Sequence, residues 1–333
     1  MKKLVLISND KLYFSKKEVF SDFNDTINII ESLSKKNNLF FVSRNSSSKG
    51  IFKTKIINKS EIKISQIKLL DTIDKKIFML SITPFNYLIF IMLNLFQKKV
   101  RGFVILRSDG FKEYEVKYGF LGKKLYEFFF KSILKKLKPI VVNDNLSNIN
   151  HYKYERIYPS EIVDIWKKNL KKPNLSKPKL LYLGRIKKEK GIFSLIELIQ
   201  DLDIDYELSV VGNKKILNLK NSKIKVFNET SNIRKIINFY DKNNIFILPS
   251  FTEGSPKVIL ESLSRLRPVI VFSEINHVKS KLQGVFITNR NTKDLKKTII
   301  YILKNYKKIQ LEMKNNNIPT KEKFQKDLMR IVK

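Results

Sequence analysis

Short runs of apolar residues alternate along most of the chain with longer segments in which apolar and polar residues are mixed at helical spacing. The first run, at residues 4–7, is followed by polar residues and then by an amphipathic stretch. A continuous apolar run of about four to eight residues indicates a buried strand, and a period of about 3.6 residues indicates a helix. The alternation predicts an α/β protein with mostly parallel sheets covered by helices on both faces.

The same pattern locates the individual elements. In the first half, strands are expected near residues 3–8, 38–43, 77–82, 102–107 and 140–143, and helices near 22–36, 85–97 and 121–137. In the second half, strands are expected near 179–183, 206–211, 223–227, 245–248, 268–272 and 284–287, with a last helix near 314–331. Each half is therefore expected to form an α/β domain.

A polar, lysine-rich segment separates the two halves. Residues 167–178 contain two prolines and few apolar residues, which is the composition of a linker. A chain of 333 residues is also comfortable for two domains, since single cores rarely grow beyond about 250–300 residues. We expect a first domain at 1–160, a linker at 161–178, a second domain at 179–313 and a C-terminal helix within 314–333.

The most apolar stretch, residues 77–96, has about the length that a membrane-spanning helix requires. Polar residues such as Ser81, Asn86 and Asn94 interrupt it, and Pro84 stands where a strand would pass into a helix. We therefore expect a strand, a proline and a buried helix. The first apolar run of the chain is too short for a signal peptide and is interpreted as a strand.

Composition narrows the classes of partner. The chain has 66 basic and 31 acidic residues, a formal net charge of +35. The lysines are spread along the whole chain, so we expect no nucleic-acid partner and favour an anionic membrane surface. The absence of cysteine excludes disulfides and thiolate metal sites and fits the cytoplasm. Since His151 and His277 lie far apart without clustered carboxylates, no metal site is expected.

Residues 111–138 leave two interpretations open. This segment combines eight lysines and three glutamates with many aromatic residues. It fits a helix that rests on an anionic bilayer, with aromatic rings at the interface and lysines towards the headgroups. It fits an ordinary amphipathic helix, half-buried on the sheet, equally well.

A first candidate ligand-binding loop follows the strand at 179–183. It begins with Gly184 and Arg185, and it ends with Lys190 and Gly191 just before a helical run. Loops at the carboxyl ends of parallel strands bind ligands in such folds, and a helix start favours an anion. Arg185 can bind two phosphate oxygens and Lys190 adds a positive charge. The alternative is a basic surface loop without a ligand.

Two further signals follow. Gly212 ends another strand and would let a ligand approach the backbone, although this signal is weak. Glu253 lies in the loop before a helix that Ser255 would cap, with Pro256 at its first position. Glu261 then falls in the second turn, where a carboxylate among apolar residues needs partners such as sugar or ribose hydroxyls. Alone, the two acids are also explained as a capping acid and an exposed helix acid.

Taken together, Gly184-Arg185-x4-Lys190-Gly191 and Glu253-x7-Glu261 resemble the motifs of the retaining, nucleotide-sugar-dependent glycosyltransferases of group 1, or family 4. The resemblance covers roughly residues 179–305. It implies the GT-B fold, with two Rossmann-like domains whose parallel sheets face each other across a cleft. It also implies that the donor binds mostly to the second domain and that the last helix crosses back to the first.

The resemblance implies specific roles for the motif residues. Arg185 and Lys190 would bind the donor diphosphate, Glu253 would contact the sugar near the reacting centre, and Glu261 would bind the ribose. Backbone N–H groups near the loop would face the sugar and phosphate, and a stretch after another strand would border the base. The remaining donor-side positions are Gly184, Gly212, Gly254, Ser255 and Pro256, with residues 226–232 at the base. No metal and no cofactor besides the donor substrate are expected.

The first domain departs from the family pattern. Ser8-Asn9-Asp10 stands where a glycine-rich turn is usual, and Arg107 and Asp109 follow a middle strand where a histidine is common. Arg107 and Asp109 are assigned to the acceptor or the reacting sugar, with a turn closed by Asp-Gly as an equal alternative.

The expected acceptor is a glycan or a lipid-linked glycan in cell-surface polysaccharide synthesis, at the inner face of the membrane. The rival functions are a nucleotide-sugar epimerase and a catalytically inactive GT-B binding protein. An intact set of Arg185, Lys190, Glu253 and Glu261 favours a transferase over either rival.

Overall fold

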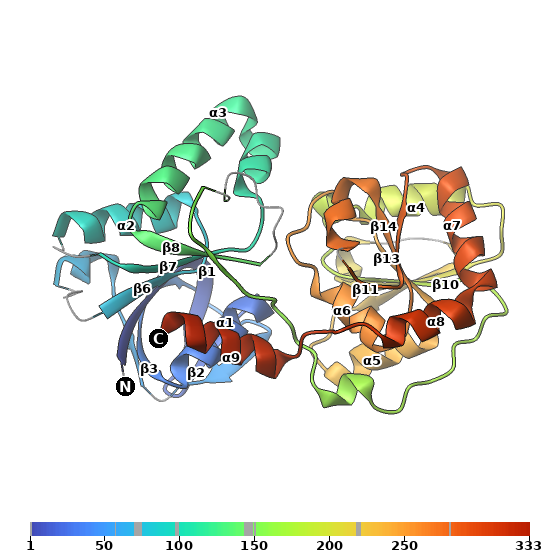
Figure 1. The fold of residues 1–333 in the computed structure, drawn as a ribbon, viewed down its shortest axis with the longest axis horizontal. Helices are drawn as coiled ribbons and strands as arrows, with labels where there is room; N and C mark the ends of the chain where they lie inside the picture. The colour runs from blue at the N-terminus through green and yellow to red at the C-terminus, as the bar shows by residue number, and fades with distance from the viewer. Residues whose placement is uncertain are drawn as a thin grey trace. The chain divides into compact units, whose positions relative to one another are not determined.

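The computed structural model describes residues 2–56, 58–69, 75–96, 100–142, 149, 151–217, 221–279 and 281–333. Clustering of contacts divides the chain into a first unit, Met1–Pro159 with Glu322–Lys333, and a second unit, Ser160–Lys321. Each has its own core and its own mostly parallel sheet, as the apolar pattern predicts (Figure 1). Residues 97 and 143, the expected ends of a helix and a strand, lie outside the described residues.

The first unit is built on a parallel sheet with a short antiparallel extension. In spatial order the parallel strands are β5 (Lys59–Glu61), β3 (Asn37–Asn45), β1 (Lys2–Phe14), β6 (Lys75–Met79), β7 (Gly102–Leu106), β8 (Leu137–Val141) and β9 (Glu155–Arg156). The end of β1 pairs antiparallel with β2 (Glu18–Ser21), and β2 pairs with β4 (Phe52–Lys55). The long strands were predicted; β2, β4, β5 and β9 are too short and too polar to give an apolar run.

Three helices lie within the amino-terminal part of this unit: α1 (Asn24–Ser34), α2 (Pro84–Phe96) and α3 (Gly110–Leu134). Pro84 begins α2, which confirms the expected succession of a strand, a proline and a helix. The helix is only half-buried, because Ile89, Phe90 and Leu93 are buried whereas Leu95 is 75% exposed. α3 begins well before the expected residue 121 and is interrupted at Gly119. Among the described residues, no helix is both long and apolar enough to cross a membrane.

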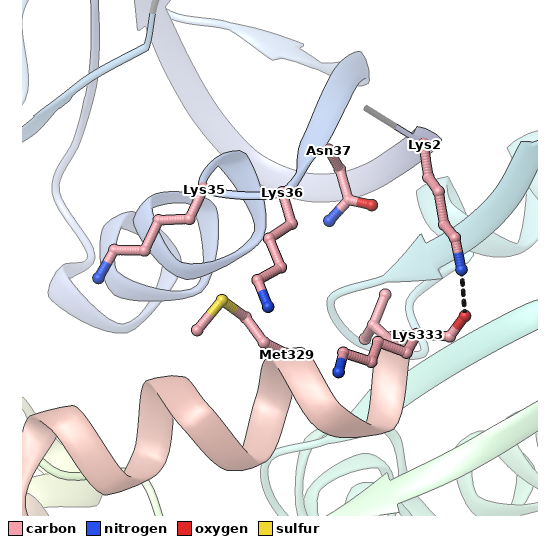
Figure 2. A pocket seen from close by; sticks show the side chains of 7 residues that line it. Lys2, Lys35, Lys36, Asn37, Met329 and Lys333 are labelled. Atoms are coloured by element: carbon pink, nitrogen blue, oxygen red, sulfur yellow. Dashed lines mark hydrogen bonds between the residues drawn. The ribbon is translucent and has the colours of Figure 1, made fainter.

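The last helix, α9 (Lys321–Val332), packs on the first unit through Phe324, Leu328 and Val332. The helix expected near 314–331 begins only at Lys321, because residues 315–320, which contain Pro319, are non-helical and separate it from α8 (Tyr306–Lys314). Beside α9 lies a cavity of about 710 Å³, and four lysines are among the residues that line it (Figure 2). It borders the first residues of β1 and β3 and is therefore at the amino ends of these strands.

The second unit has a six-stranded, fully parallel sheet. Its spatial order is β12 (Ile224–Asn228), β11 (Glu207–Gly212), β10 (Lys179–Leu183), β13 (Ile245–Leu248), β14 (Val269–Phe272) and β15 (Val285–Thr288). These strands agree with the predicted ones to within one residue at each end. The helices are α4 (Ile192–Gln200), α5 (Ile233–Lys242), α6 (Lys257–Ser264), α7 (Thr292–Lys304) and α8.

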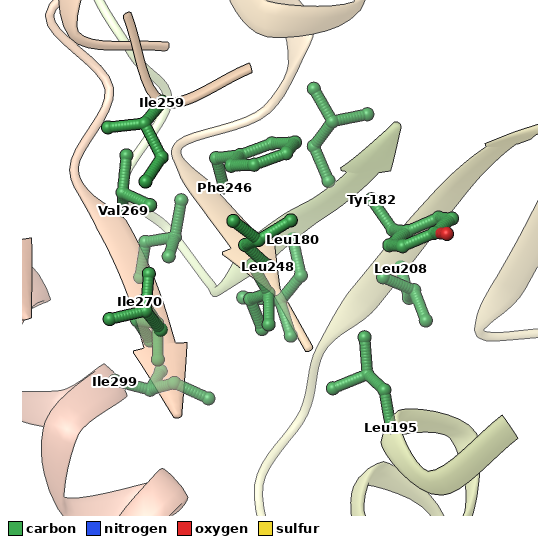
Figure 3. Close-up of a cluster of buried hydrophobic side chains, with 14 of the residues drawn as sticks. Leu180, Tyr182, Leu195, Leu208, Phe246, Leu248, Ile259, Val269, Ile270 and Ile299 are labelled. Carbon is green, nitrogen blue, oxygen red and sulfur yellow. The ribbon is translucent and has the colours of Figure 1, made fainter. Parts of the chain in front are cut away.

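Apolar side chains of the central strands form the core of this unit. Figure 3 shows Leu180, Phe246 and Ile270 from three neighbouring strands, with Leu195 of α4 and Ile299 of α7 packed against them. Because helices cover the sheet, its central strands β13 and β14 are apolar throughout and do not alternate in polarity. This explains why the strands could be located from the sequence.

The expected linker, residues 161–178, belongs to the second unit. Ile162 and Trp166 are each only 1% exposed and lie in its core cluster. Arg265 and Arg267, also buried, donate hydrogen bonds to the backbone carbonyls of residues 166, 168, 169 and 171. The polar composition resembled a linker because the partners that fix this segment lie about a hundred residues further along the chain.

Candidate functional site

The two motif loops meet at the point where the strand order of the second sheet reverses. β10 and β13 are neighbours in the sheet, but the chain continues from β10 to β11 on one side and from β13 to β14 on the other. In open α/β sheets the loops after such strands diverge, and ligands bind in the crevice between them. Residues 184–191 follow β10 and residues 249–256 follow β13. The topology therefore brings together the two segments that the sequence selected.

Backbone contacts fasten these loops to each other. The Phe251 N–H donates to the Glu189 carbonyl at 3.0 Å. Gly191 has φ of 67°, and a Cβ at this position would lie 1.9 Å from the Pro249 carbonyl oxygen. Because a side chain would be strained and would also collide with the second loop, this position requires glycine.

Arg290 holds the second loop from the other side. Its guanidinium donates to the Pro249 carbonyl at 2.9 Å and lies over the Phe251 ring, 4.1 Å from the centroid. Glu274 forms an ion pair with the same guanidinium, and that contact holds the pKa of Glu274 below its usual value despite its partial burial. Arg290 was not selected from the sequence, because nothing in its local pattern shows that it reaches this loop.

Lys190 and Glu253 form an ion pair between the two loops, with 2.7 Å between Nζ and Oε1. Both side chains are shielded from water, at 21% and 12% exposure, so their attraction is stronger than that of a surface pair. The Ser250 hydroxyl donates to the same Glu253 oxygen at 2.6 Å. His277 Nε2 donates to the Glu253 backbone carbonyl at 2.8 Å. A polyanion that approached Lys190 would compete with Glu253 for its charge.

The glycines of the strand ends serve the packing of the chain itself. A Cβ on Gly212 would lie 2.7 Å from the Gly184 carbonyl oxygen and 2.9 Å from a side-chain carbon of Ile186. The close approach of the loop after β10 therefore requires glycine at this position, and its expected contact with a ligand stays a prediction. Arg185 is exposed, and its backbone carbonyl accepts a hydrogen bond from the buried Tyr182 hydroxyl at 2.7 Å.

The start of α6 also differs from the prediction. The helix begins at Lys257, and Pro256, with ψ of 111°, is the extended residue before it. Pro256 thus takes the cap position that was expected for Ser255, and no side-chain cap is formed. Gly254 and Ser255 lie half-buried in the loop just before this start.

Glu261 lies in the second turn of α6, where it is half-buried and has a protein partner. The hydroxyl of Tyr240, a fully buried residue of α5, donates to Glu261 Oε2 at 2.9 Å. Burial raises the pKa of Glu261 to about 7, and this hydrogen bond and the nearby Lys257 charge oppose the rise. The arrangement excludes the alternative of an exposed helix acid and adds Tyr240 to the candidate site.

In the first unit, the structure gives Arg107 and Asp109 separate contacts. Arg107 lies just after β7 and forms an ion pair with Asp10 at 3.2 Å, and it donates to the Thr26 hydroxyl at 3.3 Å. Thr26 in turn donates to Asp10. Asp109 accepts a hydrogen bond from the Lys112 N–H at 3.2 Å and caps α3, as the turn interpretation requires. Asp10 was not selected as a site residue from the sequence, because it stands where the family usually has a glycine-rich turn.

The stretch expected to border the base begins in β12, the edge strand next to β11. It ends at Asn232, whose side chain caps α5 by accepting from the N–H groups of Arg234 and Lys235. Two strands, β11 and β10, separate β12 from β13 in the sheet. Among the described residues, no group of three or more acidic or histidine side chains is placed to hold a metal ion.

Sequence comparison places the second unit in a family. Residues 164–319 match the family model for group 1 glycosyl transferases. The putative teichuronic acid biosynthesis glycosyltransferase TuaC of Bacillus subtilis is 28% identical over 122 residues, which cover 36% of this chain and 31% of TuaC. The match thus spans about a third of that relative.

Structural comparison covers both units. Anabaena Alr3699/HepE in complex with UDP-glucose is similar with a TM-score of 0.68 and 10% identity over 99% of each chain. WaaG, a glycosyltransferase involved in lipopolysaccharide biosynthesis, is similar with a TM-score of 0.67 and 13% identity over 98% of this chain and 99% of WaaG. At these identities the likeness concerns the fold. The chain therefore has the GT-B fold, and its second unit belongs to the group 1 glycosyltransferases.

Proposed function

We propose that the chain transfers a sugar from a nucleoside-diphosphate sugar to a glycan or lipid-linked glycan, with retention at the anomeric carbon. The observation that carries this proposal is the meeting of the Lys190 and Glu253 loops at the switch point, with Glu261 on the helix that follows. A nucleotide sugar presents a diphosphate, a ribose and a pyranose ring. The site offers cations for the first and carboxylates for the hydroxyls of the other two.

The diphosphate is assigned to Arg185 and Lys190. As the bond between the anomeric carbon and the phosphate oxygen breaks, negative charge grows on the departing diphosphate, and cations fixed nearby stabilise it. Backbone N–H groups at the start of α4 act in the same direction. In this assignment the phosphate replaces Glu253 as the partner of Lys190. Glu253 is then released to accept hydrogen bonds from the donor sugar.

The ribose is assigned to Glu261. Its carboxylate can accept hydrogen bonds from both ribose hydroxyls, while Tyr240 keeps one oxygen in place from behind. The hydrogen bonds favour the charged form of an acid that burial has made weak. Donor binding would thus draw Glu261 towards its carboxylate form.

The acceptor is assigned to the class of cell-surface glycans, at the inner face of the membrane. The names of TuaC and WaaG, which refer to teichuronic acid and lipopolysaccharide synthesis, support this class. In the first unit, the candidate contact for the acceptor is the cluster of Asp10 in β1, Thr26 in α1 and Arg107 just after β7.

The test is a panel of UDP-, GDP- and ADP-sugars, with calorimetric binding and release of the nucleoside diphosphate as readouts. We expect one nucleotide to bind, and its sugar to be transferred or slowly hydrolysed with release of that diphosphate. Lys188→Ala is the matched control for Lys190→Ala, since Lys188 is an exposed lysine of the same loop. Sugar interconversion without diphosphate release would indicate an epimerase, and binding without any reaction would indicate an inactive binding protein.

A further inference from the structure

α3 is a hairpin of two helical limbs. Gly119, with φ of 67° and ψ of −162°, interrupts the helix, and nothing lies within 4 Å of where its Cβ would be. Glycine is therefore needed there for the bend and not for packing. The limbs run back along each other, since the ring of Tyr114 lies 5.0 Å from that of Tyr126 and the ring of Phe111 lies 5.0 Å from that of Phe130. The second limb corresponds to the helix expected near 121–137, and the first limb was not predicted.

The bend of this hairpin is exposed and, apart from Lys117, apolar. We call residues 116–121 the tip; its large side chains are Val116, Tyr118, Phe120 and Leu121, exposed by 82%, 67%, 66% and 79%. Two further exposed residues, Leu125 and Phe128, follow Leu121 at helical spacing and continue the same face along the second limb. α3 rises away from the sheet of the first unit (Figure 1). A continuous apolar surface of this kind marks an interaction site.

Charged side chains form a belt behind the tip. Lys123 of the second limb pairs with Glu115 of the first at 3.0 Å, four residues from Gly119 on either side. Lys124 and Lys131 both pair with Glu127. At about 1.5 Å per residue, the belt begins roughly 6 Å from the bend. This depth matches the roughly 5–10 Å to which interfacial helices bury their apolar faces in a bilayer.

We propose that the α3 hairpin is a membrane anchor, whose tip inserts among the acyl chains of one leaflet while the belt lies at anionic headgroups. Charge selects this occupant: a net charge of +35 favours an anionic surface and opposes docking of a second copy. Three of the five lysines in α3 are paired with glutamates, so insertion of the tip contributes more than the lysines do. The anchor does not depend on the proposed transfer reaction.

The first test is co-sedimentation of the full chain with anionic and with neutral phosphatidylcholine vesicles, at about 0.1 and 1 M salt. The tip variant is Val116→Gln/Phe120→Gln/Leu121→Gln. The control variant is Ile51→Gln/Ile216→Gln/Leu311→Gln, whose side chains are 50%, 54% and 62% exposed elsewhere on the chain. One buried apolar side chain changes a partition constant by about tenfold or more. We therefore expect the tip variant to bind anionic vesicles at least about 100-fold more weakly, and the control to bind like the wild type.

The salt dependence separates insertion from simple charge attraction. Wild-type binding to anionic vesicles should persist in part at about 1 M salt, where charge attraction is screened beyond about 3 Å. Thermal unfolding of both variants should match the wild type, because the changed side chains are exposed. Wild-type binding by a folded tip variant, or complete loss of wild-type binding at high salt, would overturn the proposal.

A fluorescent residue can report the depth of the tip. Trp166, the only tryptophan, is buried in the second unit and provides a constant background. A Leu121→Trp variant should shift its emission to the blue with anionic vesicles and be quenched by brominated acyl chains. Ile216→Trp should show neither effect. Absence of quenching, or sedimentation showing that the tip instead joins two copies of the chain, would refute the anchor.

Discussion

The carboxyl edges of the two parallel sheets are built to different degrees of rigidity. In the second unit, the loops after β10 and β13 are joined by a backbone hydrogen bond, by the Lys190–Glu253 ion pair and by the close approach of Gly191 to Pro249. In the first unit, the candidate contacts for the acceptor are those of one cluster, which consists of Arg107, Asp10 and Thr26. By the proposed assignment, the donor side is assembled before any ligand arrives, whereas the acceptor side depends on few protein contacts.

The largest expected effect concerns the segment 161–178 that precedes β10 in the second unit. Arg265 is fully buried and makes two hydrogen bonds of 2.9 Å to Asp241 besides those to residues 166, 168 and 169. Arg265→Met leaves Asp241 buried without this partner and should destabilise the chain by about 3–5 kcal/mol. Urea denaturation measures it, with exposed Arg234→Met as the control. A loss below about 1 kcal/mol would mean that the segment is held by other contacts.

Removing the cation of the rigid edge should weaken donor binding next most strongly. Lys190→Ala removes a charge-assisted contact worth about 1.5–3 kcal/mol, roughly a 10- to 150-fold loss of nucleoside-diphosphate affinity. Arg185→Ala should act similarly, and Lys188→Ala should not. Calorimetry in excess chelator should give unchanged wild-type binding. An absolute requirement for a divalent cation would contradict this assignment.

The two acids of the rigid edge should differ in which kinetic constant they change. Glu253→Ala should lower kcat by about tenfold or more with a smaller change in donor affinity, since Glu253 is placed near the breaking bond. Glu261→Ala should mainly raise KM for the donor, because the ribose is held equally before and during the reaction. Steady-state kinetics with the identified donor decides it. If the two substitutions changed kcat and KM to the same extent, the separate roles assigned to Glu253 and Glu261 would be wrong.

Glu261 should also make donor binding depend on pH. Below its pKa of about 7 the free site holds a proton that must leave before the carboxylate can accept from ribose. As the pH increases towards 7, donor affinity should thus rise by up to about tenfold per pH unit, and above pH 7 it should level off. Glu261→Gln should flatten this profile. Titrations at pH 5.5 to 8.5 measure the effect, and an unchanged slope in the variant would assign it to another group.

The same raised pKa has a consequence for stability. The folded chain keeps the Glu261 proton between the ordinary value of 4.5 and about 7, while the unfolded chain has lost it. The stabilising contribution of the protonated acid is therefore fully present below about pH 4.5 and lost as the pH rises through 7. Without donor, Glu261→Gln should melt at a higher temperature than the wild type at pH 8, and at nearly the same temperature at pH 4.5.

The smallest effect on the donor is expected from the first unit. Arg107→Met breaks the ion pair with Asp10 but lies outside the second unit, so nucleoside-diphosphate affinity should stay within about twofold. The acceptor KM should rise. A large loss of donor affinity would mean that the first unit takes part in donor binding, and the contrast between the two edges would fail.

The sequence predicted the second unit far better than the details that shape its site. Strands buried on both faces are continuous apolar runs, which is why β10 and β13 were located to the residue. Tyr240, Arg290 and His277 were not selected as site residues because each contacts a residue that is distant in the sequence. No local pattern records such contacts.

Three further differences between the predictions and the structure have specific physical causes. Pro256 was expected inside α6, but its extended ψ of 111° places it just before the helix. No bend was predicted at Gly119, because a single glycine in a helical pattern does not by itself indicate a bend. The segment 161–178 has the composition of a linker, yet its carbonyls bind two buried arginines.

The position of α9 determines the order in which the two units can fold during translation. Phe324 and Leu328 are buried beside Leu4 and Phe78 in one cluster, so the first unit buries residues from near both ends of the printed sequence. A ribosome makes α9 only after all of residues 160–321. The second unit is therefore free to fold as it emerges, whereas the first must wait with an open groove in its core until translation reaches α9. During that interval its unfilled surface is a natural target for chaperones.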